Sequence, residues 1–157
     1  PLALDRWLGF LLRQKRWPEL EEHARAGLQG GTNPQSVQYH LGAMLLVQKK
    51  VVQAQAALEE AVRLDSRGSR SQALLGSILA ARGQPMRACQ VLGQAVDHGA
   101  FTNARAQEAS TWRLLVRLLQ EQQRGDEARR RAGQWSARFP DSPQARAAVE
   151  RLRSGQD

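Results

Sequence analysis

Side chains that could catalyse a reaction or hold a metal ion are few in this sequence, and they are far apart. The three histidines, His23, His40 and His98, fall on different predicted helices or helix ends, with no cysteine or carboxylate at metal-ligand spacing. No pattern of serine, threonine or carboxylate residues suggests a nucleophile with its base, and no glycine-rich phosphate loop follows a strand. We therefore predict a noncatalytic protein that binds neither a metal ion nor a cofactor.

The single cysteine, Cys89, follows Ala88 in an apolar helical stretch and has no second cysteine with which to form a disulfide within the chain. A reactive thiol needs an activating base or another setting that lowers its pKa, and the surrounding sequence offers none. We predict that Cys89 is a small packing residue.

Arginine makes the chain strongly basic. The formal net charge is +8, and lysine occurs only at Lys15, Lys49 and Lys50, so 20 of the 23 basic residues are arginines. Such a balance suits a nucleic acid, an anionic surface or an acidic protein, and it also arises from arginines on solvated helix faces. We favour solvated faces for most of them, because the basic residues are spread over many segments. Few aromatic side chains are available to stack on bases, which ranks nucleic-acid binding lower.

The elements that position these side chains follow from an internal repeat. Five small or apolar positions recur at an offset of 34: Leu41, Gly42, Ala54, Leu58 and Ala61 correspond to Leu75, Gly76, Ala88, Leu92 and Ala95. Apolar steps of three and four favour helices over strands. A glycine inside a helix costs about 1 kcal/mol relative to alanine, so we expect another helix to cross Gly42 and Gly76 with no room for a side chain. We expect Leu58 and Leu92 to fill the space between helix pairs.

Breaks rich in glycine and proline divide the chain into pairs of helices. The first helices are predicted at 3–15, 35–48, 69–82 and 107–122, and the second at 17–29, 51–64, 85–98 and 126–138. A last helix at 143–153 is polar over much of its surface, which suits a cap at the end of a stack. The predicted fold is all-α: one α-solenoid domain over 1–157, with units at about 1–32, 33–66, 67–102 and 107–140 before the cap. No run of apolar residues approaches the roughly 20 that a membrane span needs.

This pattern resembles the tetratricopeptide repeat (TPR) family, whose 34-residue helix–turn–helix unit carries Trp, Leu-Gly, an aromatic, Ala, a large apolar residue, Ala and Pro in that order. The two central units match it well, with Leu45 or Leu79 in place of the aromatic, and the fourth unit supplies Trp112 and Pro140. The resemblance implies that the first helices of successive units line a concave groove for a peptide or a partner helix.

The groove positions that the resemblance implies are mostly basic or polar. They are Arg6, Arg13, Tyr39, His40, Arg70, Ser77, Arg113 and Arg117, with Ala43, Ala73 and Gln120 among them. An arginine-lined groove suits an acidic segment or a free carboxylate, because the guanidinium fork pairs with a carboxylate in bidentate fashion. The positions at which chaperone-binding members carry a clamp asparagine hold other residues here.

We therefore predict a noncatalytic scaffold for protein–protein interaction whose basic groove binds a peptide segment or partner protein. The alternatives are a basic nucleic-acid-binding or regulatory module and an architectural spacer in a larger protein. The composition resembles that of bacterial proteins, and bacterial members of the family often serve the assembly of pili, secretion systems or polysaccharide exporters, in the periplasm or cytoplasm. Helical phase makes Trp7 and Trp17 packing residues, and the alternative is an interface at the N-terminal end through which the chain self-associates.

Overall fold

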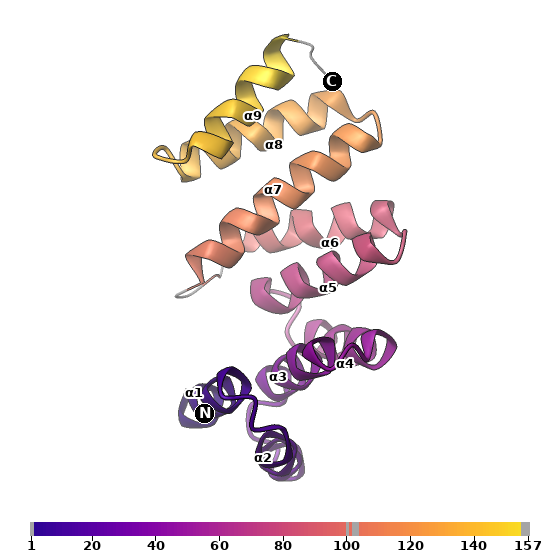
Figure 1. The fold of residues 1–157 in the computed structure, drawn as a ribbon, viewed down its shortest axis with the longest axis vertical. Coiled ribbons are helices and arrows are strands. Elements are labelled where there is room, and N and C mark those ends of the chain that lie inside the picture. The colour runs from indigo at the N-terminus through magenta and orange to yellow at the C-terminus, as the bar shows by residue number, and fades with distance from the viewer. Residues whose placement is uncertain (1, 100, 102–103, 155–157) are drawn as a thin grey trace.

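The computed structural model describes residues 2–99, 101 and 104–154, and every regular element among them is a helix. In chain order the helices are α1 (Leu2–Arg13), α2 (Trp17–Gln29), α3 (Pro34–Val47), α4 (Val51–Leu64), α5 (Ser69–Ala81), α6 (Pro85–His98), α7 (Arg105–Glu121), α8 (Gly125–Arg138) and α9 (Pro143–Ser154). They form the antiparallel hairpins α1–α2, α3–α4, α5–α6 and α7–α8, and α9 lies against α8 (Figure 1). The predicted all-α solenoid with a terminal capping helix is confirmed.

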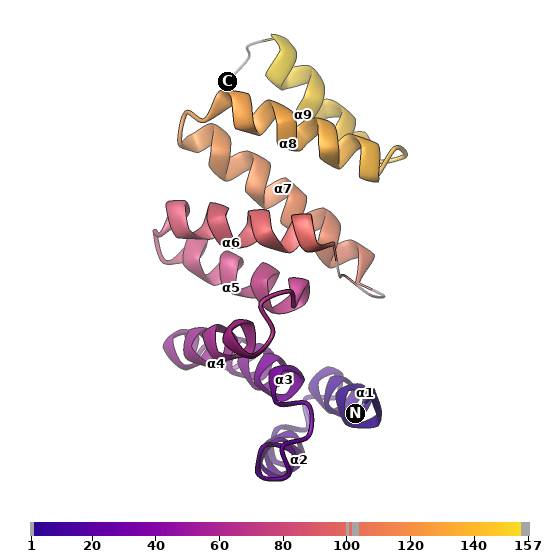
Figure 2. The same ribbon diagram turned by 180° about the vertical axis from the view of Figure 1, so that it is seen from behind.

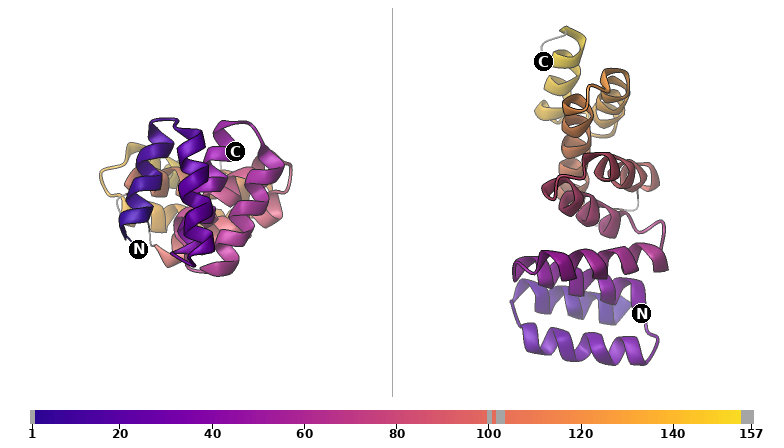
Figure 3. Two further views of the ribbon diagram at one scale, coloured as in Figure 1. Left: turned by 90° about the horizontal axis from the view of Figure 1, so that it is seen from below. Right: turned by 90° about the vertical axis from the view of Figure 1, so that its right-hand side faces the viewer.

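The hairpins follow one another along a single long axis, which the reverse view also shows (Figure 2). The hairpin α1–α2 lies at one end of the stack and α9 at the other (Figure 3). Of the helices in the described ranges, none is both long enough and apolar enough to cross a membrane.

In each of the two central hairpins, a glycine on the first helix allows the second helix to pack closely against it. A Cβ atom added at Gly42 would lie 2.7 Å from Leu58 Cγ, and one added at Gly76 would lie 2.5 Å from Leu92 Cγ. Real Cβ atoms do not approach other heavy atoms so closely, so the predicted absence of room at both glycines is confirmed. Leu58 and Leu92 are fully buried and belong to a core cluster that runs from α4 to α9, so they also join neighbouring hairpins.

Cys89 is buried in this core. The residue is 5% exposed, and Gln122 Nε2 donates a hydrogen bond to its Sγ atom over 3.0 Å. Burial raises the pKa of the Cys89 thiol and outweighs the hydrogen bond from Gln122, which acts in the opposite sense. The predicted packing role is confirmed.

Candidate binding groove

The first helices of the hairpins form the inner side of a curved stack. The backbones of α1 and α3, of α3 and α5, and of α5 and α7 come close to each other. Among the described residues, the backbones of the second helices α2, α4, α6 and α8 do not come close to one another. Long side chains span the distance between them, as Arg131 of α8 does when it pairs with Asp97 of α6. A stack whose first helices are close and whose second helices are spread curves toward the first helices. Side chains at the junctions of α1, α3, α5 and α7 therefore line or underlie its concave face.

Asp5 joins α1 to α3. Its carboxylate accepts a hydrogen bond from the Ser36 hydroxyl and lies 3.0 Å from His40 Nε2. Burial alone would raise the pKa of Asp5, but the hydrogen bonds from Ser36 and His40 outweigh it and hold that pKa below its ordinary value. An ionised carboxylate only accepts hydrogen bonds, so His40 Nε2 carries the proton in this contact.

His40 is buried beneath the groove surface. It is 2% exposed, and its Nδ1 atom has no hydrogen-bond partner among the described residues. Burial lowers the pKa of His40, the Asp5 carboxylate opposes this, and the charges of Arg70 and Arg13 add to the lowering. The structure thus corrects the prediction that His40 contacts a partner: it positions Asp5 from below, and a bound segment could not reach it.

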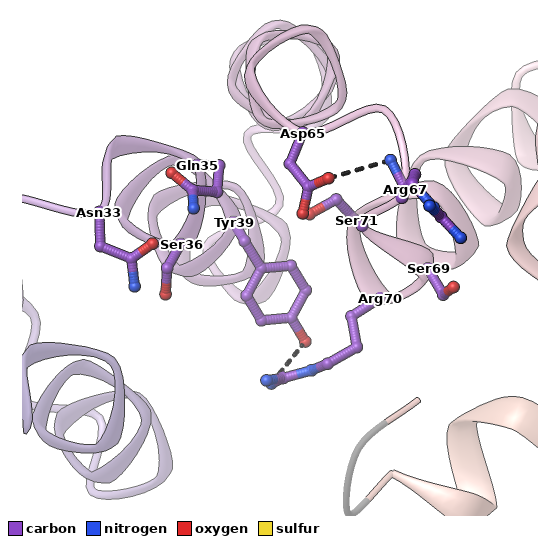
Figure 4. Close-up of a pocket in the computed structure, with 10 residues that line it drawn as sticks. Asn33, Gln35, Ser36, Tyr39, Asp65, Arg67, Ser69, Arg70 and Ser71 are labelled. Atoms are coloured by element: carbon purple, nitrogen blue, oxygen red, sulfur yellow. Dashed lines mark hydrogen bonds between the residues drawn. The ribbon is translucent and has the colours of Figure 1, made fainter. Parts of the chain in front are cut away.

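Tyr39 and Arg70 join α3 to α5 and face a cavity of about 230 Å³ (Figure 4). The Arg70 guanidinium carbon lies 4.4 Å from the centroid of the Tyr39 ring, and Arg70 Nη2 donates to the tyrosine hydroxyl over 3.2 Å. Arg70 Nε is buried with no hydrogen-bond partner in the described part of the chain. The guanidinium is therefore held in one orientation by an aromatic ring and makes no ion pair with a carboxylate among the described residues.

Polar groups surround this pair in the cavity. Its lining includes Ser36, Ser69 and Ser71, and it also holds one carboxylate, Asp65, whose Oδ1 atom accepts the backbone N–H of Arg67 over 3.0 Å. On the far side of α5, Gln107 of α7 donates to the backbone carbonyl of Arg70 over 3.3 Å. Three successive first helices thus fix the position of Arg70.

Solved structures of other proteins share this arrangement of helices. No protein-family model and no curated protein sequence matches the chain. YrrB, a TPR protein with an unusual peptide-binding site, matches with a TM-score of 0.69 and 17% identity over 98% of this chain and 76% of its own. PilF of Pseudomonas aeruginosa matches with a TM-score of 0.68 and 23% identity over 98% of this chain and 65% of its own. This chain has the TPR fold. At these identities the likeness concerns the fold alone.

Within this TPR fold, no hydrogen bond, ion pair or ring contact among the described residues joins the remaining predicted groove residues to the Tyr39–Arg70 pair. Arg6, Arg13 and Arg113 are exposed and make no ion pair in the described residues. Arg117 pairs with Glu121 over 3.4 Å, and both side chains are largely exposed. The Ser77 hydroxyl donates to the carbonyl of Ala73 in its own helix over 3.0 Å.

Two residues of the groove were missing from the sequence prediction, although the TPR register could have found them. Asp5 stands 34 positions before Tyr39, and Ser36 stands 34 positions before Arg70. They therefore occupy the same places on α1 and α3 as two predicted groove residues do on the following helices. The predicted groove positions did not include these two places on α1 and α3.

Proposed function

We propose that this chain is a noncatalytic scaffold that binds an acidic protein segment, or one with a free terminal carboxylate, on the concave face of α1, α3, α5 and α7. The observation that carries the proposal is the state of Arg70. Its guanidinium is stacked on Tyr39, partly buried, and within ion-pair distance of no carboxylate of the described residues, and its charge acts at longer range on Asp5, where it helps to lower the pKa of that carboxyl.

An arginine in this state favours an anion for two physical reasons. Hydrogen bonds between a guanidinium and a carboxylate are roughly twice as strong as bonds between neutral groups, and partial burial reduces the competition from water. The Tyr39 ring and hydroxyl already restrict the rotamers of Arg70, so less conformational entropy is lost when a ligand binds. Tyr39 adds an apolar face against which the bound segment can pack.

Two further cations on α7 extend the same surface. Arg113 is exposed and has no acidic partner in the described ranges. Arg117 is engaged only by an exposed pair with Glu121 within its own helix. Because exposed pairs of this kind contribute about 0–1 kcal/mol, a carboxylate of a bound segment could replace Glu121 at little cost. We place the peptide along the line from Arg70 to these two residues.

We further propose that the scaffold serves the assembly of bacterial envelope machinery, such as a pilus, a secretion system or a polysaccharide exporter. What supports this is fold-level likeness to PilF together with the arginine-rich composition. The rival functions are a nucleic-acid-binding or regulatory module and an architectural spacer. Nucleic-acid binding would show a steep fall of log affinity with log salt, and a spacer would bind none of the probes.

The test is fluorescence anisotropy at 50 and 200 mM salt with four labelled probes. These are a decapeptide rich in Asp and Glu with a free C-terminus, the same peptide amidated, its Asn/Gln analogue, and a DNA duplex. The variants are Arg70→Gln and Arg113→Glu/Arg117→Glu. The control is Arg130→Glu on α8, an exposed arginine that makes no ion pair among the described residues and lies outside the groove.

We expect both groove variants to weaken binding of the acidic peptide at least tenfold, since a hydrogen bond to a charged group contributes about 1.5–3 kcal/mol. Arg130→Glu should change the affinity less than twofold. The amidated peptide separates a terminal carboxylate from acidic side chains as the recognised group. Equal losses in the control and the groove variants, or tighter binding of the duplex than of the peptide, would overturn the proposal.

A further inference from the structure

A second cavity, of about 450 Å³, lies where α7 meets the α8–α9 loop and the first turn of α9. After α6 the register continues with an offset of 40, as Leu75 of α5 corresponds to Leu115 of α7. The pair α7 and α9 therefore repeats the pair α3 and α5 after 74 residues, in agreement with the starts of α5 at Ser69 and of α9 at Pro143. The backbones of α7 and α9 come close to each other, as those of α3 and α5 do. This α7–α9 cavity is thus the counterpart of the α3–α5 cavity that holds Arg70.

The two cavities differ in the chemistry of their lining. Where the α3–α5 cavity has Gln35 and Asp65, the α7–α9 cavity has Ala109 and Phe139. Ala106, which is exposed, extends this apolar wall one turn earlier on α7. The rest of the described lining is Arg105, Asp141, Ser142 and Gln144. A cavity with polar walls and a cavity with an apolar wall thus lie at equivalent places of one stack.

Arg105 borders the apolar wall and offers a cation beside it. Its guanidinium carbon lies 5.3 Å from the centroid of the Phe139 ring, and its side chain makes no ion pair in the described part of the chain. Glu108 on the same helix is buried and is already engaged by Arg138 over 2.8 Å. Asp141, at the rim, is exposed and makes no ion pair in the described ranges either. Arg105 is therefore placed to meet a carboxylate that neighbours an apolar side chain packed against Phe139.

Helical phase places the α7–α9 cavity on the groove face of α7. Residues seven apart on a helix are separated by nearly two full turns and lie on the same face. Ala106 precedes Arg113 by seven residues, Arg117 follows one turn later, and all three are exposed. The apolar wall thus shares its face of α7 with the two arginines along which we place the bound segment. A segment that begins at Arg70 and continues past Arg113 comes next to this cavity.

We propose that the α7–α9 cavity binds a large apolar side chain of the acidic segment that Arg70 holds. This inference rests on the proposed function and adds a second side chain by which the partner is chosen. First helices that pack side by side are about 8–10 Å apart, so cavities that are two helix intervals apart are separated by about 20 Å. An extended segment rises about 3.3 Å per residue. The apolar residue therefore stands about six positions from the acidic one.

The test is fluorescence anisotropy with labelled, amidated peptides that carry a pair of aspartates and a phenylalanine six positions from it. The comparison peptides have alanine in place of the phenylalanine, or the phenylalanine three positions from the pair. Each peptide is made in both chain directions, because a segment can follow the groove either way. Ala106→Trp fills the cavity from an exposed position, and Ala56→Trp on α4 is the matched control, since Ala56 is an exposed alanine outside the groove. Far-UV circular dichroism verifies that each variant is folded.

In one chain direction, the peptide with phenylalanine at six positions should bind at least tenfold more tightly than the alanine peptide. Ala106→Trp should remove this advantage and leave the affinity for the alanine peptide within twofold, whereas Ala56→Trp should change neither affinity. Arg70→Gln should weaken both peptides by the same factor, because the acidic pair and the apolar side chain occupy separate cavities.

Equal affinities for the phenylalanine and alanine peptides would overturn the apolar site. An advantage of phenylalanine that survives Ala106→Trp, or that is equally large at three positions from the pair, would overturn it as well. In each of these cases the alanine peptide and Arg70→Gln still test the proposed function on their own. A phenylalanine advantage that Ala106→Trp removes, with affinities that Arg70→Gln leaves unchanged, would support the apolar site and overturn the acidic one. Binding of none of the peptides would overturn both proposals.

Discussion

Replacing Gly76 by alanine tests the packing rule on which the stack depends. A Cβ atom at this position would lie 2.5 Å from Leu92 Cγ and 2.6 Å from its Cδ2 atom. Because Leu92 is fully buried, it has no open space into which to move. Alanine favours the helix by about 1 kcal/mol over glycine, while overpacking of a core costs about 1–3 kcal/mol. We therefore expect a net loss of unfolding free energy of up to about 2 kcal/mol.

Gly133→Ala in α8 is the matched control, since a Cβ atom there meets no atom within 4 Å. Only the helix-propensity term acts at this position, so we expect a gain of about 1 kcal/mol. The difference between the two variants then isolates the contact with Leu92. That difference should be about 1–3 kcal/mol, which is well above the error of the measurement.

Urea unfolding followed by far-UV circular dichroism measures both variants, with slopes compared as well as midpoints, because repeat proteins can lose cooperativity. Leu92→Ala alone should cost about 2–5 kcal/mol. In the Gly76→Ala/Leu92→Ala variant the new methyl group enters space that the leucine has left, so the double loss should be smaller than the sum of the single ones. Equal gains from Gly76→Ala and Gly133→Ala, or strict additivity in the cycle, would refute the reasoning.

Two further predictions concern buried charge. In the folded chain the pKa values of His40 and Asp5 lie below their ordinary values. As the pH falls, the unfolded chain therefore binds protons at both residues before the folded chain does, and the free energy of unfolding decreases. This loss should begin as the pH drops through about 6.5 for His40 and through about 3.9 for Asp5. Thermal unfolding between pH 7.5 and pH 5 should show the first part of this loss, and His40→Gln should remove it. Arg138→Gln should lower Tm, because it leaves the buried Glu108 carboxylate without its guanidinium partner 2.8 Å away. Arg117→Gln breaks only an exposed pair, and an equal fall of Tm in this variant would contradict the prediction.

The fold was predictable because its determinants are local in sequence. Gly42 and Gly76 each lie where the two helices of one hairpin come closest, and the offset of 34 places the second glycine at the same position in its hairpin as the first. The predicted helix bounds differ from the structure by at most two residues at any end. The depth of a side chain at a junction between hairpins was not predictable in the same way. Tyr39 and His40 are neighbours on α3, yet one lines the cavity and the other is sealed under α1. Asp5 and Gly9 of α1 lie against His40, and the apolar period of α3 alone does not encode those contacts.

The 34-residue register also separates the positions at which the residue type repeats from those at which it changes. At the packing places of the two central hairpins the same residue types return, glycine at 42 and 76 and leucine at 58 and 92, whereas the first hairpin holds Leu8 and Ala24 there. At the groove place that holds Tyr39, the preceding helix carries Asp5 and the following one carries Ala73. Packing constrains the first set in the two central units and leaves the second set free to differ. The likeness to YrrB and PilF at 17% and 23% identity thus transfers the packing rule. In the function that we propose, partner choice depends instead on the residues that break the repeat, with Arg70 foremost because Tyr39 of the preceding hairpin already holds it in place.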